Sequence, residues 1–176
     1  AVGERLAAQA RQRPGIVWHL GQAVGGLTHA DGGWQVRLDG GKALSAKALV
    51  LATGVRPVHP AVYFGTGAEV LDAVTLTARR DSLPAGRTLL MGGGDNALEN
   101  ADYLSRRGHQ VTLWSRDDYR GRAAHIAALA AHPALVQRHR MPLPTALRPA
   151  AGGGVEVESA AFGSERFDTV AVLFGY

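Results

Sequence analysis

Three consecutive glycines, Gly92 to Gly94, stand between an apolar run and a stretch with helical spacing. With Ala97 they form the pattern Gly92-x-Gly94-x-x-Ala97, which fits the glycine fingerprint of a loop that binds a dinucleotide pyrophosphate. Gly92 would make the tight turn, Gly94 would let the pyrophosphate approach the backbone, and Ala97 would pack the helix on the strand. We therefore expect the backbone of six consecutive residues to bind this anion at the helix N-terminus: Gly92, Gly93, Gly94, Asp95, Asn96 and Ala97. A structural turn with no ligand is the alternative.

Charged residues follow the next apolar strand, at the place where dinucleotide sites choose their cofactor. An acidic residue there accepts a hydrogen bond from the ribose 2′-hydroxyl and repels a 2′-phosphate, whereas arginine pairs with that phosphate. Here the strand is closed by Ser115 and Arg116, and Arg120 follows, which favours NADP over NAD. Asp117 and Asp118 leave the choice open, and a solvated charged loop without a ligand is the alternative.

The elements around these residues alternate between strands and helices. Spacing of 3.6 residues predicts helices at 71–80, 98–106 and 122–131. Apolar runs predict strands at 87–91, 111–114, 135–138 and 169–176, and a hairpin formed by 154–159 and 164–168. This order predicts an α/β fold, a doubly wound, Rossmann-like nucleotide-binding domain with a parallel sheet and a β insertion near its end. The buried strand 169–176 with no loop after it suggests a boundary cut through a larger protein.

The N-terminal part has a different pattern. A helix is expected at 2–13, followed by strands at 16–20, 33–38 and 46–54, separated by Asp-Gly-Gly turn signals. This is the pattern of a small antiparallel meander. The last run, 46–54, is the most apolar and ends in Ala-Thr-Gly at Thr53 and Gly54.

Composition excludes several classes of protein. The chain of 176 residues has no Cys, so a disulfide scaffold, a thiolate metal site and a redox-active cysteine pair are absent from its sequence. Its seven His show no metal-ligand spacing, and we expect no metal site. The net charge of +4 is spread along the chain, which argues against nucleic-acid binding. No run approaches the length of a membrane span, and we expect a soluble, cytoplasmic protein.

Three segments together resemble the thioredoxin-reductase type of flavoprotein within the pyridine nucleotide-disulphide oxidoreductases. Residues 49–57, "LVLATGVRP", are similar to the family's second flavin-domain motif, residues 89–120 to its NADPH-binding segment, and residues 167–176 to the strand that leads back to the flavin domain. The resemblance implies a partial FAD-binding domain at 1–55 and an NAD(P)-binding domain at 56–176. It also implies that Thr53 and Gly54 contact FAD in the full-length protein and that Gly175 lies beside the cofactor.

The departures from the family pattern narrow the expected activity. The family's first FAD fingerprint and its later Gly-Asp segment are not in this sequence, and the stretch 70–86, where thioredoxin reductases carry Cys-x-x-Cys, has no Cys. The branch without those cysteines includes ferredoxin–NADP reductases of the thioredoxin-reductase-like type. We therefore expect an NADPH-binding part of an FAD-dependent oxidoreductase that reduces a non-disulfide acceptor, such as a ferredoxin or a small molecule, with a homodimer as one assembly to test.

No residue of this chain is required as a catalytic acid or base, because hydride transfer between nicotinamide and flavin is the chemistry of the two cofactors. In such an enzyme the protein residues bind and orient. Two other functions remain open from the sequence. One is a flavin-dependent monooxygenase, which also combines an Ala-Thr-Gly segment with a second glycine fingerprint. The other is a non-catalytic NADP-binding module.

Overall fold

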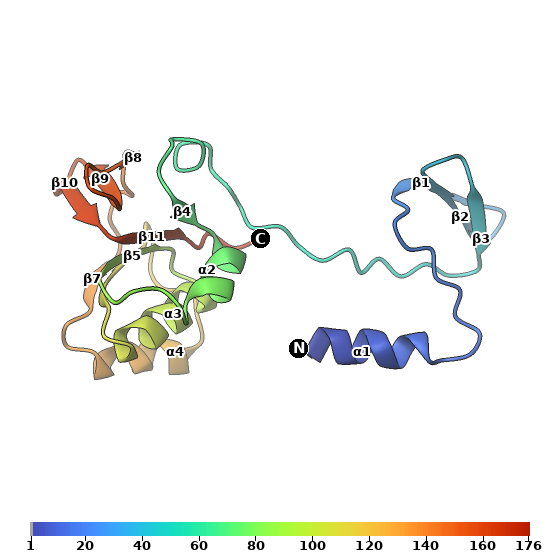
Figure 1. The fold of residues 1–176 in the computed structure, drawn as a ribbon, viewed down its shortest axis with the longest axis horizontal. Helices are drawn as coiled ribbons and strands as arrows, with labels where there is room; N and C mark the ends of the chain where they lie inside the picture. Colours follow the sequence, from blue (N-terminus) through green and yellow to red (C-terminus); the bar gives the residue numbers. More distant parts are fainter. Residues whose placement is uncertain (1) are drawn as a thin grey trace. The chain divides into compact units, whose positions relative to one another are not determined.

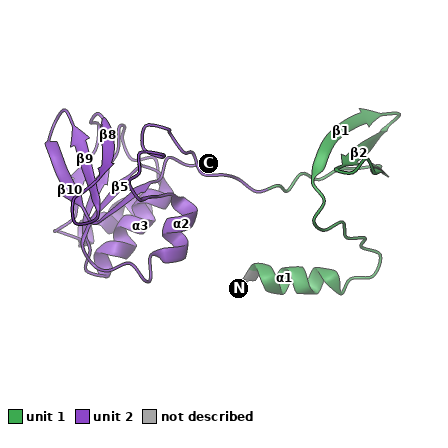
Figure 2. Cartoon of the chain, turned by 45° about the horizontal axis from the view of Figure 1, so that its top comes forward, with its two compact units in different colours: residues 1–53 green, residues 54–176 purple. Residues whose placement is uncertain are grey.

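The computed structural model describes residues 2–176, and the polypeptide forms two compact units, Ala1–Thr53 and Gly54–Tyr176 (Figure 2). Contacts within each unit define its fold. The assignment of residues 1–55 to flavin binding and of residues 56–176 to nucleotide binding stays a prediction.

Unit 1 contains one helix and a three-stranded antiparallel sheet. Helix α1 spans Val2–Arg11, and the strands, in the order β1-β2-β3, are β1 Val24–Ala30, β2 Gly33–Leu38 and β3 Ala43–Ala46. Strands β1 and β2 are joined by Asp31 and Gly32, which both have positive φ (51° and 73°). An Asp-Gly pair with this backbone is the favoured two-residue hairpin turn, because its twist matches that of the strands.

Two of the strands expected in this unit are wrong. Residues 16–20 are not a strand, and of 46–54 only Ala46 belongs to one, at the end of β3. Both runs are apolar, yet neither finds a neighbouring strand among residues 2–176, and a strand needs such a partner for its backbone groups. The strand that does form, β1, escaped prediction because its Gly25-Gly26 resembles a turn and glycine has a low strand propensity.

Unit 2 is built on a five-stranded parallel sheet with the order β4-β11-β5-β6-β7 (Figure 1). The strands are β4 Val70–Leu71, β5 Arg87–Met91, β6 Gln110–Trp114, β7 Val136–Arg138 and β11 Thr169–Val172. The helices are α2 Ala73–Arg79, α3 Asp95–Arg106 and α4 Ala123–Ala128, which continues as the 3₁₀ turn Leu129–Ala131. The predicted strand–helix–strand unit around the glycines is confirmed, and the fold is Rossmann-like.

A second, antiparallel sheet with the order β10-β9-β8 forms the β insertion. Its strands are β8 Ala146–Pro149, β9 Val155–Ser159 and β10 Gly163–Phe167. The hairpin β9–β10 was expected, whereas β8 lies in a proline-rich stretch without a strand pattern. Helices α2, α3 and α4 lie on one face of the parallel sheet and this second sheet on the other (Figure 1). The domain is therefore layered helix, sheet, sheet, and the expectation of a doubly wound domain, with helices on both faces, is wrong.

Alternating side chains of the parallel strands build the two cores of unit 2. Leu90 and Leu113 point to the helices and pack with Leu98 and other apolar residues of α2 and α3. Their neighbours Leu89 and Trp114 point to the opposite face and pack against β8–β10. This alternation follows from the two-residue period of a strand. Burial on both faces explains why consecutive positions of these strands are apolar, at 89–91 in β5 and 113–114 in β6.

Among residues 2–176, no helix is both long enough and apolar enough to cross a lipid bilayer.

Candidate functional site

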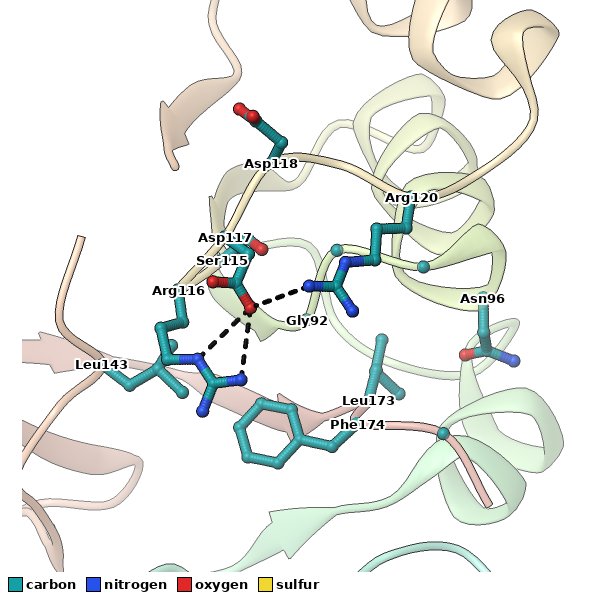
Figure 3. Close-up of a pocket in the computed structure, with 13 residues that line it drawn as sticks. Gly92, Asn96, Ser115, Arg116, Asp117, Asp118, Arg120, Leu143, Leu173 and Phe174 are labelled. Carbon is teal, nitrogen blue, oxygen red and sulfur yellow. Dashed lines mark hydrogen bonds and ion pairs between the residues drawn. The ribbon is translucent and has the colours of Figure 1, made fainter. Parts of the chain in front are cut away.

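A cavity of about 430 Å³ opens at the carboxyl ends of three neighbouring strands of unit 2 (Figure 3). Its walls are the glycine loop after β5, the charged loop after β6, the segment after β11, and Leu143 from the connection between β7 and β8. The chain runs from β5 to β6 and β7 on one side of the sheet, and β11 then pairs with the other side of β5. The cavity therefore lies at the topological switch point, where open α/β sheets bind their ligands.

The first two glycines of the loop are required by the packing of the protein itself. Gly92 has φ +148°, and a Cβ placed on it would lie 2.4 Å from the carbonyl oxygen of Leu173. A Cβ on Gly93 would lie 2.4 Å from the hydroxyl oxygen of Ser115. The buried Ala97 approaches the same turn, 3.3 Å from the Cβ position of Gly92. The tight turn and the close helix–strand packing expected for Gly92 and Ala97 are both present.

Gly94 has no such internal reason to be glycine. Its backbone is extended (φ −90°, ψ 177°), a conformation open to any residue. Apart from Gly94 and its chain neighbours, no heavy atom of the described residues lies within 4 Å of the position of its missing Cβ. Gly94 is also the N-cap of α3, and no side chain caps this helix end. Within residues 2–176, the N–H groups of Gly94, Asp95 and Asn96 have no hydrogen-bond acceptor. These donors and the helix dipole face an open space at the cavity.

One detail of the expected anion site is wrong. The N–H of Ala97 is not unpaired, because it donates to the carbonyl oxygen of Gly94 at 3.0 Å. Neither Ala97 nor Asp95 lines the cavity. The Asp95 carboxylate turns instead to the start of α4, where Oδ1 accepts from the N–H of Arg122 at 2.6 Å and contacts His125 Nδ1 at 3.0 Å. The hydrogen bond from Arg122 is the main reason why the pKa of Asp95 is lowered.

The loop after β6 brings two arginines and a carboxylate to the cavity. Ser115 is buried, and its N–H donates to the carbonyl oxygen of Arg138 at 2.7 Å, which fixes the end of β6. Beyond it, Asp117 Oδ2 accepts from Arg116 Nε and Nη2 at 3.3 and 3.2 Å and from Arg120 Nη2 at 3.5 Å. The N–H of Arg120 donates to Gly93 O at 2.8 Å, so the charged loop is tied to the glycine loop.

Asp118, next along the chain, has a different partner. Its two carboxylate oxygens accept from Arg140 Nε and Nη2 at 2.6 and 2.7 Å, and this hydrogen-bonded pair lowers the pKa of Asp118. Arg140 follows β7 and has a positive φ of 57°. The hydroxyl of the adjacent Tyr119 is buried without a hydrogen-bond partner among the described residues, and burial raises its pKa to about 12. The Asp118–Arg140 pair anchors the loop on the side away from the two arginines.

The structure thus brings together most of the predicted binding residues. The cavity is lined by Gly92, Gly93, Gly94, Asn96, Ser115, Arg116, Arg120 and Gly175. Thr53 and Gly54 are exposed, and neither of the two cavities described in residues 2–176 includes them. Their contact with FAD stays a prediction.

Five further lining residues were not among the predicted ones: Asp117, Asp118, Leu143, Leu173 and Phe174. The two aspartates had a signal, because they stand between the predicted arginines. Leu173 and Phe174 directly follow the last parallel strand, so the carboxyl-end rule could have found them. Leu143 had no sequence signal, since its position depends on where the connection between β7 and β8 folds.

The parallel sheet, the glycine turn and the cavity at the switch point define the class as a Rossmann-like fold. The chain belongs to the pyridine nucleotide-disulphide oxidoreductase family, whose sequence pattern matches residues 1–131. The family consists of FAD- and NAD(P)H-dependent oxidoreductases, and the expected membership is confirmed.

Solved structures of similar fold include two thioredoxin reductases. The enzyme from T. acidophilum has a TM-score of 0.72 and 19% identity over 99% of this chain and 58% of its own. The enzyme from Lactococcus lactis, in its FR conformation, has a TM-score of 0.69 and 18% identity over 88% of this chain and 52% of its own. An engineered water-forming NADPH oxidase bound to NADPH has a TM-score of 0.63 and 20% identity over 88% of this chain and 37% of its own. The chain thus spans about half the length of these thioredoxin reductases and less of the oxidase.

Proposed function

We propose that residues 54–176 bind NADP(H) and present it to the flavin of an FAD-dependent oxidoreductase. The single observation that carries the proposal is Gly94. It has unpaired N–H neighbours at a helix N-terminus and an open space where its Cβ would be. A pyrophosphate is the kind of ligand that needs a backbone anion site without a side chain in the way.

The cavity fits the other parts of such a ligand. Its volume of about 430 Å³ is in the range of small-molecule sites. Apolar walls at Leu143, Leu173 and Phe174 would cover flat rings, and the polar groups gather at the loop after β6. This division between an apolar and a charged end matches a nucleotide whose phosphates are its most charged part.

The preference for NADP rests on the loop after β6. Ser115 and Arg116 stand where an NAD site usually has an acid, and Arg120 brings a second guanidinium to the same cavity wall. Guanidinium groups bind phosphate through paired N–H donors, and each charge-assisted contact is stronger than one to a neutral hydroxyl. Both groups are therefore suited to the 2′-phosphate of NADP.

The acceptor of the electrons is inferred from the missing cysteines. Reduction of a protein disulfide needs a thiolate that attacks it. In the thioredoxin-reductase arrangement the thiol pair lies between the Ala-Thr-Gly segment and the glycine fingerprint, and here the stretch 55–86 contains no Cys. A bound FAD would supply the hydride-accepting chemistry in the full-length protein. Because this stretch has no thiols, we infer an acceptor that is not a disulfide, such as a ferredoxin or a small molecule.

Calorimetry of the purified chain with NADP tests the binding step. One NADP per chain is expected, with weaker binding of NAD. Absence of binding by both nucleotides would refute the proposal, because the anion site and the cavity belong to this chain. The variant Arg106→Ala serves as a control, since Arg106 pairs with Asp102 on α3 and does not line the cavity.

The acceptor is tested with the full-length protein supplied with NADPH and, in turn, thioredoxin, ferredoxin, ferricyanide and oxygen. Turnover with ferredoxin or ferricyanide is the expected result. Efficient turnover with thioredoxin, in a protein without a cysteine pair outside this segment, would contradict the inference. Stoichiometric water or peroxide formation would assign oxygen as the acceptor instead.

A further inference from the structure

Asp117 places a carboxylate between the two arginines of the cavity (Figure 3). All three hydrogen bonds from Arg116 and Arg120 converge on one oxygen, Oδ2. The chain thus supplies its own anion at the position where two guanidinium groups meet. Any phosphate that uses both arginines must compete with this carboxylate.

The contacts of Asp117 are loose enough for such competition. Their lengths of 3.2 to 3.5 Å exceed the ~2.8 Å of a good charge-assisted hydrogen bond. The side chains of Arg116, Asp117 and Arg120 are 73%, 45% and 78% exposed, so water screens their attraction. Asp118 differs, because both its oxygens bind Arg140 at 2.6 and 2.7 Å. A phosphate can therefore replace Asp117 as the partner of its arginines, whereas Asp118 is held firmly by Arg140.

We propose that Asp117 is a specificity-determining residue, which limits the preference of this site for NADP over NAD by competing with the 2′-phosphate for Arg116 and Arg120. The inference rests on the proposed function, namely that the cavity binds a nicotinamide dinucleotide. When the 2′-phosphate displaces the Asp117 carboxylate, this negative charge stays on the same short loop and repels the phosphate. NAD, which has a free 2′-hydroxyl and no 2′-phosphate, does not have to displace this carboxylate.

The test compares two small probes that carry only the adenosine end of the cofactors. Adenosine 2′,5′-bisphosphate has the 2′-phosphate, and 5′-AMP lacks it. Calorimetry of the full chain with both probes is done for the wild type, for Asp117→Asn and for Asp118→Asn. The two variants remove the same charge from neighbouring positions, so a general change in net charge affects both. Circular dichroism establishes that each variant is folded.

Asp117→Asn is expected to tighten binding of the bisphosphate by about threefold to tenfold, while binding of 5′-AMP changes by less than about twofold. Asp118→Asn loosens the loop from Arg140, so its effect on affinity should be about equal for the two probes. An equal change for both probes in Asp117→Asn, or no change for either, would overturn the inference. Weaker binding of 5′-AMP would also overturn it, because Asp117 would then be an acceptor for the ribose hydroxyls.

A wild-type chain that binds neither probe nor either dinucleotide would refute the proposed function, and with it this inference. A wild-type chain that binds them, but whose discrimination is unaffected by Asp117→Asn, would refute the inference alone.

Discussion

The glycine loop gives a sharp prediction, because its first and third glycines are glycine for different reasons. Gly92→Ala should destabilise the fold, whereas Gly94→Ala should leave the fold intact and lose the ligand. At Gly92 the backbone conformation, with φ +148°, costs about 1–3 kcal/mol for a residue with a side chain. Overlap of the new Cβ with the Leu173 carbonyl oxygen, 2.4 Å away, adds about 1–3 kcal/mol. The expected loss of about 2–6 kcal/mol is a large part of the stability of an ordinary domain.

For Gly94→Ala the favourable and unfavourable contributions to stability nearly cancel. The extended backbone suits alanine, whose lower freedom in the unfolded chain stabilises by about 0.4–1 kcal/mol, while alanine is a poorer N-cap by a similar amount. The free energy of unfolding should therefore change by less than about 1 kcal/mol. If the pyrophosphate binds as proposed, the new methyl group should block its approach to the backbone. Loss of affinity by about tenfold to a hundredfold corresponds to about 1.4–2.8 kcal/mol.

The assay pairs urea unfolding of the full chain with NADP calorimetry. Trp114 is completely buried in unit 2, so its fluorescence reports the unfolding of this unit, and Trp18 and Trp34 are replaced by Phe in all compared chains. Wild-type affinity in Gly94→Ala would refute the placement of the pyrophosphate at this residue. A loss of stability in Gly94→Ala as large as that in Gly92→Ala would refute the structural distinction between the two glycines.

Three further outcomes are expected. Arg116→Ala should remove about 1–2 kcal/mol of the preference for NADP over NAD in calorimetry, and added salt should weaken NADP more than NAD, because the extra contact joins exposed charges. His109 is buried, with its Nδ1 2.9 Å from Thr88 Oγ1, and burial lowers its pKa. The unfolded chain therefore binds a proton at His109 more readily than the folded chain, and stability should fall as the pH drops below about 6.5. The urea midpoint of His109→Gln should fall less over the same pH range. The isolated chain should be colourless after gel filtration with added FAD, and a stoichiometric yellow flavin would show that residues 1–176 hold a complete flavin site.

The sequence predicted the region around the glycines well because local and tertiary signals agree there. Residues 87–91 form β5 as expected, and the helix and strand that follow lie where the apolar periodicity placed them. Gly92, Ala97 and the strand ends impose local packing that only a few residue types satisfy. The residue types of the glycine fingerprint are therefore enough to predict the local backbone structure.

Prediction was poorest where a segment depends on a distant neighbour. Residues 46–54 are as apolar as β5, yet only Ala46 is part of a strand. Arg140 lacks any pattern, although it fixes Asp118 and so leaves Asp117 to the other two arginines. The β insertion covers a sheet face that alternation alone would assign to helices, because a strand buried on both sides has the same apolar pattern whatever packs on it.

The position of β11 within the sheet has a consequence for the order in which the domain can assemble. This strand pairs with β5 on one side and with β4 on the other, yet it follows both by a long stretch of chain: Thr88 pairs with Thr169, and Val70 with Val170. During synthesis, β5, α3, β6 and β7 emerge before β11 and can associate through contacts between residues close in sequence. The edge of β5 that pairs with β11 in the folded domain is unpaired until β11 has been made. Closing such long loops carries an entropic cost and slows folding. A nascent chain halted before residue 169 would expose that apolar edge, and its readiest partner would be the same edge of another unfinished chain.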